Sequence, residues 1–453
     1  MDLKTKMMAL VDKGVAITKS ILDKMGFDFK KLNFDIGIEI IPHIKNGGKG
    51  IKILLSLVVI AVVLAAVRFI FGIGIISNLT DGYPWGVWIG FDVMSGVALA
   101  AGGFTTAALV HLFGREKYHP AVRPAILTAF LGYVLVAVGL LVDLGRPWDI
   151  WHLFLYWNKD SALAEVGWCV VLYLCVLFTE FVPVILEKYK WEKALKVYYI
   201  VAPWACVVFV SVFVLIMTSS TQYMMVVFVL LAVLLVFFGL TIAKSGTMLI
   251  VYMAGVIFST AHQSSLGTLM LIVPTKLNSL WYTPALPLYF YASAIAVGFA
   301  MVIFESTLSS KGFGFKLETD VIQGLGKILR WLVIFVFAFR AIALYMQTGF
   351  RFNADVYQLV FFAIEIIGGL LIPIILLFAS SDPKTVFRAA GLYVFLGVVL
   401  NRFNVSFIGL PVPGYSVYWP HPFEVLISAG VLSAGILVYY LIGKNFPVFE
   451  HHD

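Results

Sequence analysis

The sequence of 453 residues is poor in charge: Asp, Glu, Lys and Arg make up 13% of it, and hydrophobic residues make up 61%. Soluble domains carry about a quarter charged residues, so this composition excludes a soluble enzyme. Apolar runs long enough to span a bilayer recur along nearly the whole chain. The short alternating segments of a membrane barrel are absent from the sequence. We therefore predict an all-α polytopic integral membrane protein.

Cysteine is also scarce. Cys169, Cys175 and Cys206 lie inside apolar runs without metal-site spacing. Iron–sulfur clusters normally need four thiolates, so we expect this chain to hold no cluster and no metal. His262 and His111 fall at opposite ends of predicted spans, which disfavours a shared haem. The net charge of +7 comes mainly from short linkers between apolar runs, which indicates a positive-inside bias rather than nucleic-acid binding.

The apolar runs predict about twelve transmembrane helices, arranged as two helical bundles plus an extra hairpin. The predicted spans are 51–76, 85–113, 121–142, 164–186, 197–217, 222–243, 247–266, 284–307, 325–347, 357–379, 386–406 and 422–442. Basic linkers alternate with poorly basic ones, and an even number of spans places both termini in the cytoplasm. We divide the chain into a basic amphipathic amino-terminal arm (1–50), a first bundle (51–190), an extra hairpin (191–246) and a second bundle (247–453).

Two sets of one arginine and one acid lie inside predicted spans, where ionisable groups are costly. Arg68 and Asp92 lie at similar depths in the first two spans, and because sequential helices are usually neighbours, they can pair. Arg340 and Glu365 repeat this arrangement in the ninth and tenth spans. The four residues are either buried ion pairs that fix helix register or parts of a proton relay, and the sequence leaves both open.

A second polar cluster is predicted where the outer ends of several spans converge. Its members are Asp143, Arg146, Trp148, Trp151, His152 and Glu165, with His262, Gln263 and Arg402 as secondary candidates. Asp143 and Arg146 are three residues apart, so a local ion pair is the alternative for these two. The tryptophans at these ends favour a docking surface or an amphipathic ligand entrance.

Four motifs of this sequence resemble the NrfD family, which comprises the membrane subunits of polysulfide reductase and related complexes. The motifs are Pro84-Trp-Gly-Val-Trp-Ile-Gly-Phe-Asp92, Tyr118-His-Pro-Ala-Val-Arg-Pro124, Asp143-Leu-Gly-Arg-Pro147 and His262-Gln-Ser-Ser265. The resemblance extends from about Arg68 to the last span. Within the family it is closest to the membrane subunits of quinone-linked nickel–iron hydrogenases.

The resemblance implies a cofactor-free subunit of a bacterial inner-membrane complex that reacts with menaquinone or another quinone. It also implies a ferredoxin-like iron–sulfur subunit or a multihaem cytochrome docked on the outer face, with a hydrogenase or molybdopterin-type catalytic subunit behind it. Carried over, Asp143 and Arg146 line the quinone head group, with Glu165 and His152 nearby. Asp92 belongs to the polar interior of the first bundle.

A secondary transporter is the alternative, since twelve spans and buried charges also suit that class. Such a transporter binds its substrate near the midplane on broken helices. The polar cluster predicted here lies near one surface, beside tryptophans. The hairpin from about Val197 to Ala243 and the long basic arm depart from the family pattern, which leaves the parent complex open.

Overall fold

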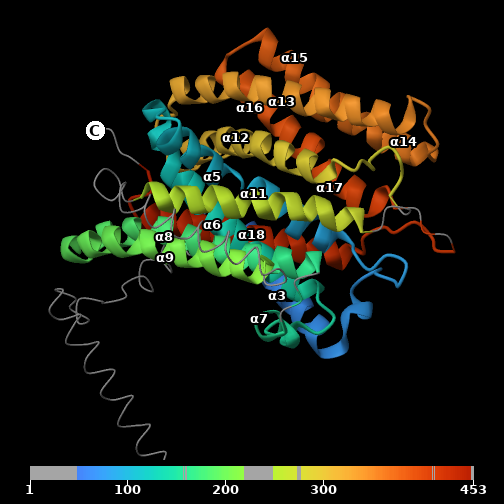
Figure 1. Ribbon diagram of the computed structural model, residues 1–453, viewed down its shortest axis with the longest axis horizontal. Coiled ribbons are helices and arrows are strands. Elements are labelled where there is room, and N and C mark those ends of the chain that lie inside the picture. The colour runs from blue at the N-terminus through green and yellow to red at the C-terminus, as the bar shows by residue number, and fades with distance from the viewer. Residues whose placement is uncertain are drawn as a thin grey trace, which may run out of the picture.

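The computed structural model describes residues 48–156, 158, 161–218, 248–272, 277–410, 412 and 414–449. Within these residues every regular element is helical (Figure 1). Eleven helical segments of this described part are long and apolar enough to cross a membrane. The chain is therefore an all-α polytopic membrane protein, as predicted. Residues 1–47 of the predicted arm and the span predicted at 222–243 lie outside the described residues.

The helices follow the apolar runs of the sequence. Those in the first part are α3 (Lys49–Phe71), η3 (Trp88–Ser95), α4 (Gly96–Leu99), α5 (Gly102–Ala107), η4 (Ala108–Leu112), α6 (Val122–Asp143), α8 (Ala162–Lys188) and α9 (Glu192–Thr218). Those after residue 248 are α11 (Leu249–Leu271), α12 (Leu286–Phe313), α13 (Thr319–Thr348), α14 (Val356–Ala363), η7 (Ile364–Leu371), α15 (Ile372–Ala379), α16 (Pro383–Leu392), η8 (Tyr393–Val399), α17 (Leu400–Phe403), η9 (Asn404–Ile408) and α18 (Pro422–Asn445). Short helical turns in the connections are η2 (Ile73–Ile75), η5 (Glu116–Ala121), η6 (Pro147–Asp149) and α7 (His152–Leu155).

Local turn chemistry sets several helix boundaries. Gly314 follows the last residue of α12 and Gly349 follows the last residue of α13, with φ of 80° and 55°, a left-handed conformation that favours glycine. Pro383 and Pro422 occupy the first positions of α16 and α18, where their missing N–H groups would have no partner within the helix. The sequence therefore encodes these helix ends locally.

Most of the described helices pack as two four-helix bundles (Figure 1). The first contains η3–η4, α6, α8 and α11, and the second contains α12, α13, α14–α15 and α16–α17. The bundles meet where α12 packs against α11 and crosses α4 and α5. The crossing is close, since a Cβ added to Gly298 would lie 2.9 Å from the carbonyl of Ala101. α11, with which the predicted second bundle begins, packs on both α8 of the first bundle and α12 of the second.

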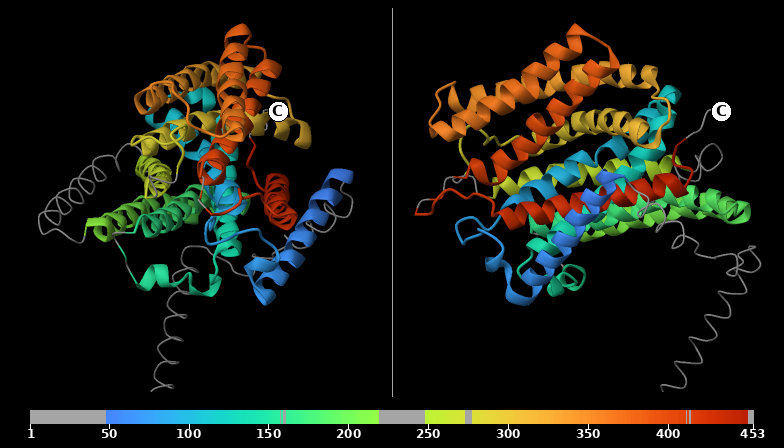
Figure 2. Two further views of the ribbon diagram at one scale, coloured as in Figure 1. Left: turned by 90° about the vertical axis from the view of Figure 1, so that its right-hand side faces the viewer. Right: turned by 180° about the vertical axis from the view of Figure 1, so that it is seen from behind.

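Three helices flank the first bundle. α3 and α18 pack along each other and lean against the bundle through α6 and η3 (Figure 2). α18, which falls in the segment predicted as the second bundle, thus packs beside the first. α9, the described half of the predicted hairpin 191–246, packs against α8 and α11.

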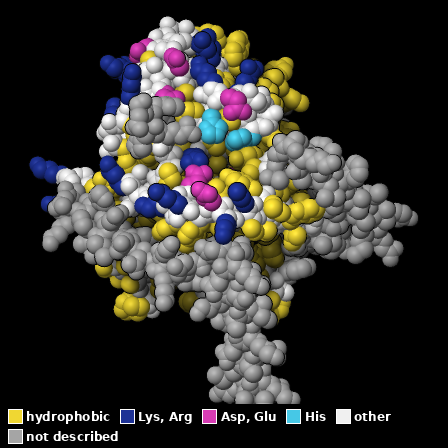
Figure 3. All heavy atoms as spheres, turned by 90° about the vertical axis from the view of Figure 1, so that its left-hand side faces the viewer, with side chains coloured by type: hydrophobic (Ala, Val, Ile, Leu, Met, Phe, Trp, Pro, Cys, Tyr) yellow, Lys and Arg dark blue, Asp and Glu magenta, His cyan; other side chains and the backbone are white. Residues whose placement is uncertain are grey.

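The helices run between two ends of the molecule. The Asp143 end carries the connections 72–87, 144–161 and 409–421, and the Lys444 end carries 113–121 and 314–318. Lys and Arg side chains gather at the Lys444 end (Figure 3). They include Arg115, Lys117, Lys188, Lys190, Lys311, Lys316, Lys384 and Lys444. This asymmetry is the one that a positive-inside orientation requires.

Candidate functional site

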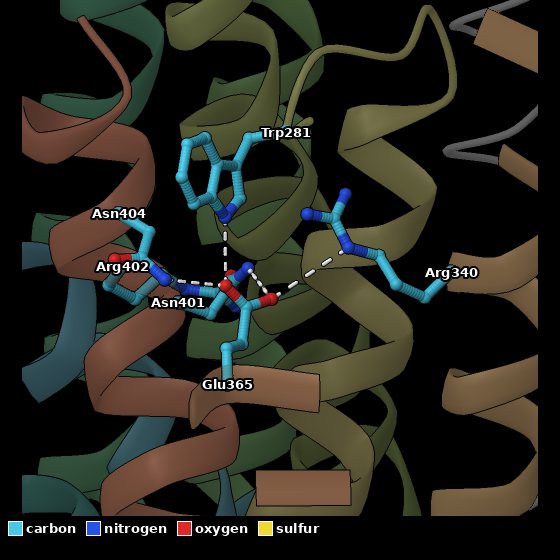
Figure 4. A network of polar contacts seen from close by, with 6 residues as sticks. All are labelled: Trp281, Arg340, Glu365, Asn401, Arg402 and Asn404. Atoms are coloured by element: carbon cyan, nitrogen blue, oxygen red, sulfur yellow. Dashed lines mark hydrogen bonds and ion pairs between the residues drawn. The ribbon is translucent and has the colours of Figure 1, made fainter. Parts of the chain in front are cut away.

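Several polar residues predicted from the sequence lie in three buried clusters, together with residues that were not predicted. The Asp143 cluster (Arg68, Asp92, Asp143, Glu424 and Ser428) lies among α3, η3, α6 and α18. The His262 cluster (Tyr133, Glu165, Tyr173, His262 and Ser265) lies among α6, α8 and α11. The Glu365 cluster (Trp281, Arg340, Glu365, Asn401, Arg402 and Asn404) lies within the second bundle (Figure 4).

Asp143 is the last residue of α6 and is bracketed by an arginine from α3. The Arg68 Nε donates to the Val142 carbonyl at 2.7 Å, and its Nη2 donates to the carbonyl of Leu144. Arg68 is 2% exposed although most of α3 faces outward. The Asp143 Oδ1 is buried and has no hydrogen-bond partner among the described residues.

Two further acids complete the Asp143 cluster. The Oδ2 of Asp92 accepts a 2.6 Å hydrogen bond from Ser428. Glu424 is fully buried and accepts from the backbone N–H of Asn78 at 2.7 Å and from the Tyr418 hydroxyl. Arg68, Glu424 and Asp92 are the ionisable side chains that lie near Asp143.

Glu424 was not predicted from the sequence. An acid in the first turn of the last apolar run is the signal that would have identified it. Burial and the hydrogen bond to Glu424 raise the pKa of Tyr418, which keeps this phenol a neutral donor near neutral pH.

The two ion pairs that the sequence offered around this cluster do not form in the structure. Arg68 turns to backbone carbonyls at the end of α6, and Asp92 accepts from Ser428, so these two residues do not pair with each other. The Arg146 side chain is 79% exposed and lies 4.0 Å from Asp149 instead of pairing with Asp143. The reason is that α6 ends at Asp143, and a spacing of three residues shares a face only while the helix continues.

The predicted aromatic approach forms an exposed surface just beyond Asp143 in the chain. Trp148 is 62% exposed and Trp151 is 48% exposed. The His152 ring meets the Trp151 ring edge-on, with 4.0 Å between centroids. α7, which carries His152, is anchored to α8 because Leu153 fills the space beside Gly167.

The His262 cluster lies deeper in the first bundle. The Tyr133 hydroxyl and the His262 Nδ1 are 3.1 Å apart, and the Tyr133 ring meets Tyr173 edge-on with 4.7 Å between centroids. Ser265 donates to the Glu165 Oε1 at 2.5 Å. His262 is fully buried, and its Nε2 has no partner among the described residues.

The placement of His262 corrects the sequence analysis. The predicted span stopped at residue 266 and put His262 at an outer end, whereas α11 continues to Leu271. His262 therefore lies about 14 Å inside the bundle at 1.5 Å per residue. Gln263 donates to the carbonyl of Val97 at 2.9 Å and ties α11 to α4, which is a packing contact.

Glu180 is a second acid that was not predicted. It is 7% exposed, and its Oε2 has no partner among the described residues. Gly255 of α11 leaves space for it, because a Cβ added there would lie 3.2 Å from the Glu180 Oε1. Glu165, Tyr173 and Glu180 share one face of α8, so polar groups extend from the Asp143 end deep into the first bundle.

In the Glu365 cluster, both carboxylate oxygens of Glu365 have partners (Figure 4). The Glu365 Oε2 accepts from Trp281 Nε1 at 2.8 Å and from Asn404 Nδ2 at 2.6 Å. The Oε1 accepts from Asn401 Nδ2 at 2.9 Å and lies 3.7 Å from Arg340 Nε. Arg340 and Glu365 therefore do lie together, as one buried ion pair within a larger network.

Arg402 belongs to this network and not to an outer-end cluster with His262. Its Nη1 donates to Asn401 at 2.7 Å, its Nη2 donates to Ser293 at 2.9 Å, and its guanidinium lies 3.7 Å above the Phe290 ring centre. Its helical run continues to Ile408, past the predicted boundary, and so carries Arg402 into the interior.

Three of the buried polar residues lie on π-helical turns: Asp92 on η3, Glu365 on η7 and Asn404 on η9. Such turns occur frequently at functional sites. They shift side chains relative to an α-helical register, which is why the depth and direction of these residues could not be counted from an even 3.6-residue period.

The fold and these buried acids define a polytopic membrane protein with polar sites inside its bundles. Residues 75–413 match the family described as polysulphide reductase, NrfD. The chain therefore belongs to the NrfD family, and the family resemblance of the sequence motifs is confirmed.

Relatives cover most of this chain. A protein of Nitratidesulfovibrio vulgaris is 37% identical over 88% of this chain and 94% of its own length. A probable Ni/Fe-hydrogenase 2 b-type cytochrome subunit of Escherichia coli is 29% identical over 88% of this chain and 92% of its own. The integral membrane subunit of a menaquinone reductase of N. vulgaris is 25% identical over 83% of this chain and 86% of its own length.

The name of the E. coli relative includes a b-type cytochrome, and haem in a helical bundle needs axial ligands such as facing histidines. His262 is the only buried histidine among the described residues, and its Nδ1 is engaged with Tyr133. His111 lies near the Lys444 end, where its ring stacks on Tyr252 at 4.0 Å. The described residues therefore do not fit a haem held between two histidines.

Proposed function

We propose that this chain is the quinone-reactive membrane subunit of a respiratory oxidoreductase complex and that the quinone head group reacts at the Asp143 cluster. Quinone chemistry moves two electrons and two protons, so a titratable group must reach the head group. The observation that carries the proposal is the buried Asp143 Oδ1, which has no partner among the described residues while Arg68 fixes the backbone on both sides.

Each group of the site has a separate task in this proposal. Asp143 exchanges a proton with the quinone through its free oxygen, and Glu165 is a second acid at the same end of the bundle. Trp148 and Trp151 provide an exposed apolar approach from the lipid. Arg146, 79% exposed, and His152 lie at the rim, where they meet the head group on its way in.

Electrons are exchanged with a partner docked at the Asp143 end, a ferredoxin-like iron–sulfur subunit or a multihaem cytochrome. A hydrogenase or molybdopterin-type catalytic subunit completes the complex, and menaquinone or another quinone is the substrate. The names of the E. coli hydrogenase and N. vulgaris menaquinone reductase relatives support this assignment. The chain holds no haem or cluster of its own in this proposal.

We place the chain in a bacterial cytoplasmic membrane with both termini inside, because basic side chains gather at the Lys444 end. A reporter fused after Lys444 should read as cytoplasmic, and one inserted between Thr348 and Val356 should read as external. Reports from opposite sides for the two termini would contradict this topology.

Proton transfer across the first bundle is a second candidate activity. The polar line from Glu165 through Ser265, His262 and Tyr133 towards Glu180 favours it. In sealed vesicles, Glu180→Gln should reduce the proton gradient formed per quinone turned over. An unchanged ratio of protons to electrons would exclude this route.

A stand-alone secondary transporter would not need partner subunits. Co-purification of the intact chain with an iron–sulfur or haem protein therefore separates the two classes. Isolation of a fully active chain without any redox partner would favour the transporter.

Asp143→Asn tests the quinone site directly, because it keeps shape and hydrogen bonding but removes the titratable carboxylate. Quinone turnover per assembled complex should fall by about two to four orders of magnitude, the usual contribution of general acid–base catalysis. Electron transfer from the partner to a dye that bypasses the quinone should survive on the same preparation. Normal quinone turnover at normal assembly would remove Asp143 from the mechanism.

A further inference from the structure

Two helices of the Asp143 cluster lie outside the part of the chain that matches the family. The matching residues are 75–413, whereas α3 ends at Phe71 and α18 begins at Pro422. These two helices pack along each other on one side of the first bundle (Figure 2). The family match therefore contains Asp92 and Asp143 but neither of the helices that surround them.

α3 and α18 approach each other at backbone distance. A Cβ added to Gly430 of α18 would lie 2.1 Å from the Ala61 Cβ and 2.7 Å from the carbonyl of Leu57. Small residues at such crossings let membrane helices pack closely. The buried residues of α3 are Ala61 and Arg68, which lie two turns apart on one face. Ala61 packs against α18, and Arg68 reaches the Asp143 cluster.

The partners that the structure gives to the two acids come from this helix pair. Arg68 of α3 donates to the carbonyls of residues 142 and 144, on both sides of Asp143. Ser428 of α18 donates to Asp92, and the buried Glu424 of α18 lies near Asp143.

The position of Arg68 has two physical consequences for Asp143. A planar guanidinium can donate two hydrogen bonds in a fixed fork, which holds the last turn of α6 in place. A buried cation beside a carboxyl group also favours its charged form. The other titratable groups that face Asp143 are Asp92 from η3 and Glu424 from α18, and both oppose that charge.

We propose that α3 and α18 form a clamp on the family core and that Arg68 is a positioning residue that aims Asp143 and keeps it ready to exchange a proton. This inference rests on the proposed quinone reaction at Asp143. It adds that the clamp, and not the matched core alone, sets the pH at which that reaction runs.

The test compares Arg68→Gln, Arg68→Lys and Asp143→Asn in the intact complex, with quinone turnover per assembled complex measured against pH. For Arg68→Gln we expect turnover at neutral pH to fall about tenfold or more and the midpoint of the pH profile to move about 1 to 3 pH units towards alkaline pH, because a cation next to the carboxylate is lost. Arg68→Lys keeps the charge, so it should restore the midpoint while turnover stays reduced, since an ammonium lacks the fork geometry.

The outcomes separate the two proposals. An inactive Asp143→Asn with a wild-type pH midpoint in Arg68→Gln would overturn the clamp alone. Normal turnover in Asp143→Asn would overturn the quinone site itself. A purely structural role for Arg68 predicts lower assembly in Arg68→Gln, with an unchanged midpoint in the complex that assembles, and would also overturn the clamp.

Gly430→Ala tests the clamp without touching a charge, and it serves if Arg68→Gln fails to assemble. The added Cβ forces α18 away from Ala61, so the pH midpoint should move in the same direction as in Arg68→Gln. Gly50→Ala is the matched control on α3, because a Cβ there would meet nothing within 4 Å. An assembled Gly430→Ala complex with the midpoint of Gly50→Ala would contradict the proposal.

Discussion

Glu365 and Asp143 are both acids in the interior of the helical bundles, but their surroundings differ. Both oxygens of Glu365 accept hydrogen bonds from side chains: Trp281 and Asn404 donate to Oε2, and Asn401 donates to Oε1. The Asp143 Oδ1 has no partner among the described residues. A buried carboxylate whose oxygens are all satisfied is held in one place, whereas one with a free oxygen can still serve a ligand.

The comparison assigns different roles to the two bundles. In the second bundle both oxygens of Glu365 have partners on neighbouring helices, which ties these helices together, although nitrogens of Arg340 and Arg402 and the Asn404 Oδ1 have no hydrogen-bond partner among the described residues. In the first bundle Arg68 holds the backbone around Asp143 and leaves one carboxylate oxygen open. In the sequence, Arg68–Asp92 and Arg340–Glu365 look alike, because each is one arginine and one acid about 25 residues apart. In the structure, the two sets make different contacts.

The largest effect is expected from Glu365→Leu. It leaves Arg340 buried without its acid, which costs about 3–5 kcal/mol of stability. The yield of assembled complex and its thermal midpoint should both fall, with a smaller loss for Glu365→Gln. Quinone turnover per assembled complex should stay near normal. Normal stability together with lost turnover would reverse the comparison between the bundles.

A smaller effect is expected from Gly369→Ala, where η7 and η8 touch. A Cβ there would lie 2.4 Å from the backbone nitrogen of Gly397, so the helices must separate at a cost of about 1–3 kcal/mol. Gly74→Ala is the control, because a Cβ at that position meets nothing within 4 Å. Equal thermal midpoints for the two variants would show that the second bundle is not packed as rigidly as its network indicates.

The smallest effect is expected from Ser428→Ala, which removes the hydrogen bond to Asp92. Stability should change by about 1 kcal/mol, while quinone turnover should change several-fold because Asp92 acts on the charge of Asp143. Ser433→Ala is the matched variant, since Ser433 donates to the Ala429 carbonyl of its own helix at 2.7 Å. Similar turnover in both variants would separate Asp92 from the reaction.

Several features of the site were predictable because they depend on local composition. Asp143, Glu165 and Asp92 are acids in or beside apolar runs, and such residues mark polar interiors. Glu180 and Glu424 follow the same rule but were not predicted, because both lie towards the ends of their helices, where an acid is as often exposed to solvent. The sequence offered Arg146 as a possible ion-pair partner of Asp143, but α6 ends at Asp143, so the spacing of three residues does not bring the two side chains together.

The sequence by itself determined the all-α membrane class, most of the spans and the family, because apolar length and short motifs are local properties. Only the tertiary structure decided which helix faces which. Arg68 meets the end of α6 rather than Asp92, and His262 lies inside the first bundle instead of at its surface. One physical reason is that π-helical turns and helix ends change the helical register by less than one turn. The other is that helices distant in the sequence, such as α18, supply contacts that no local spacing encodes.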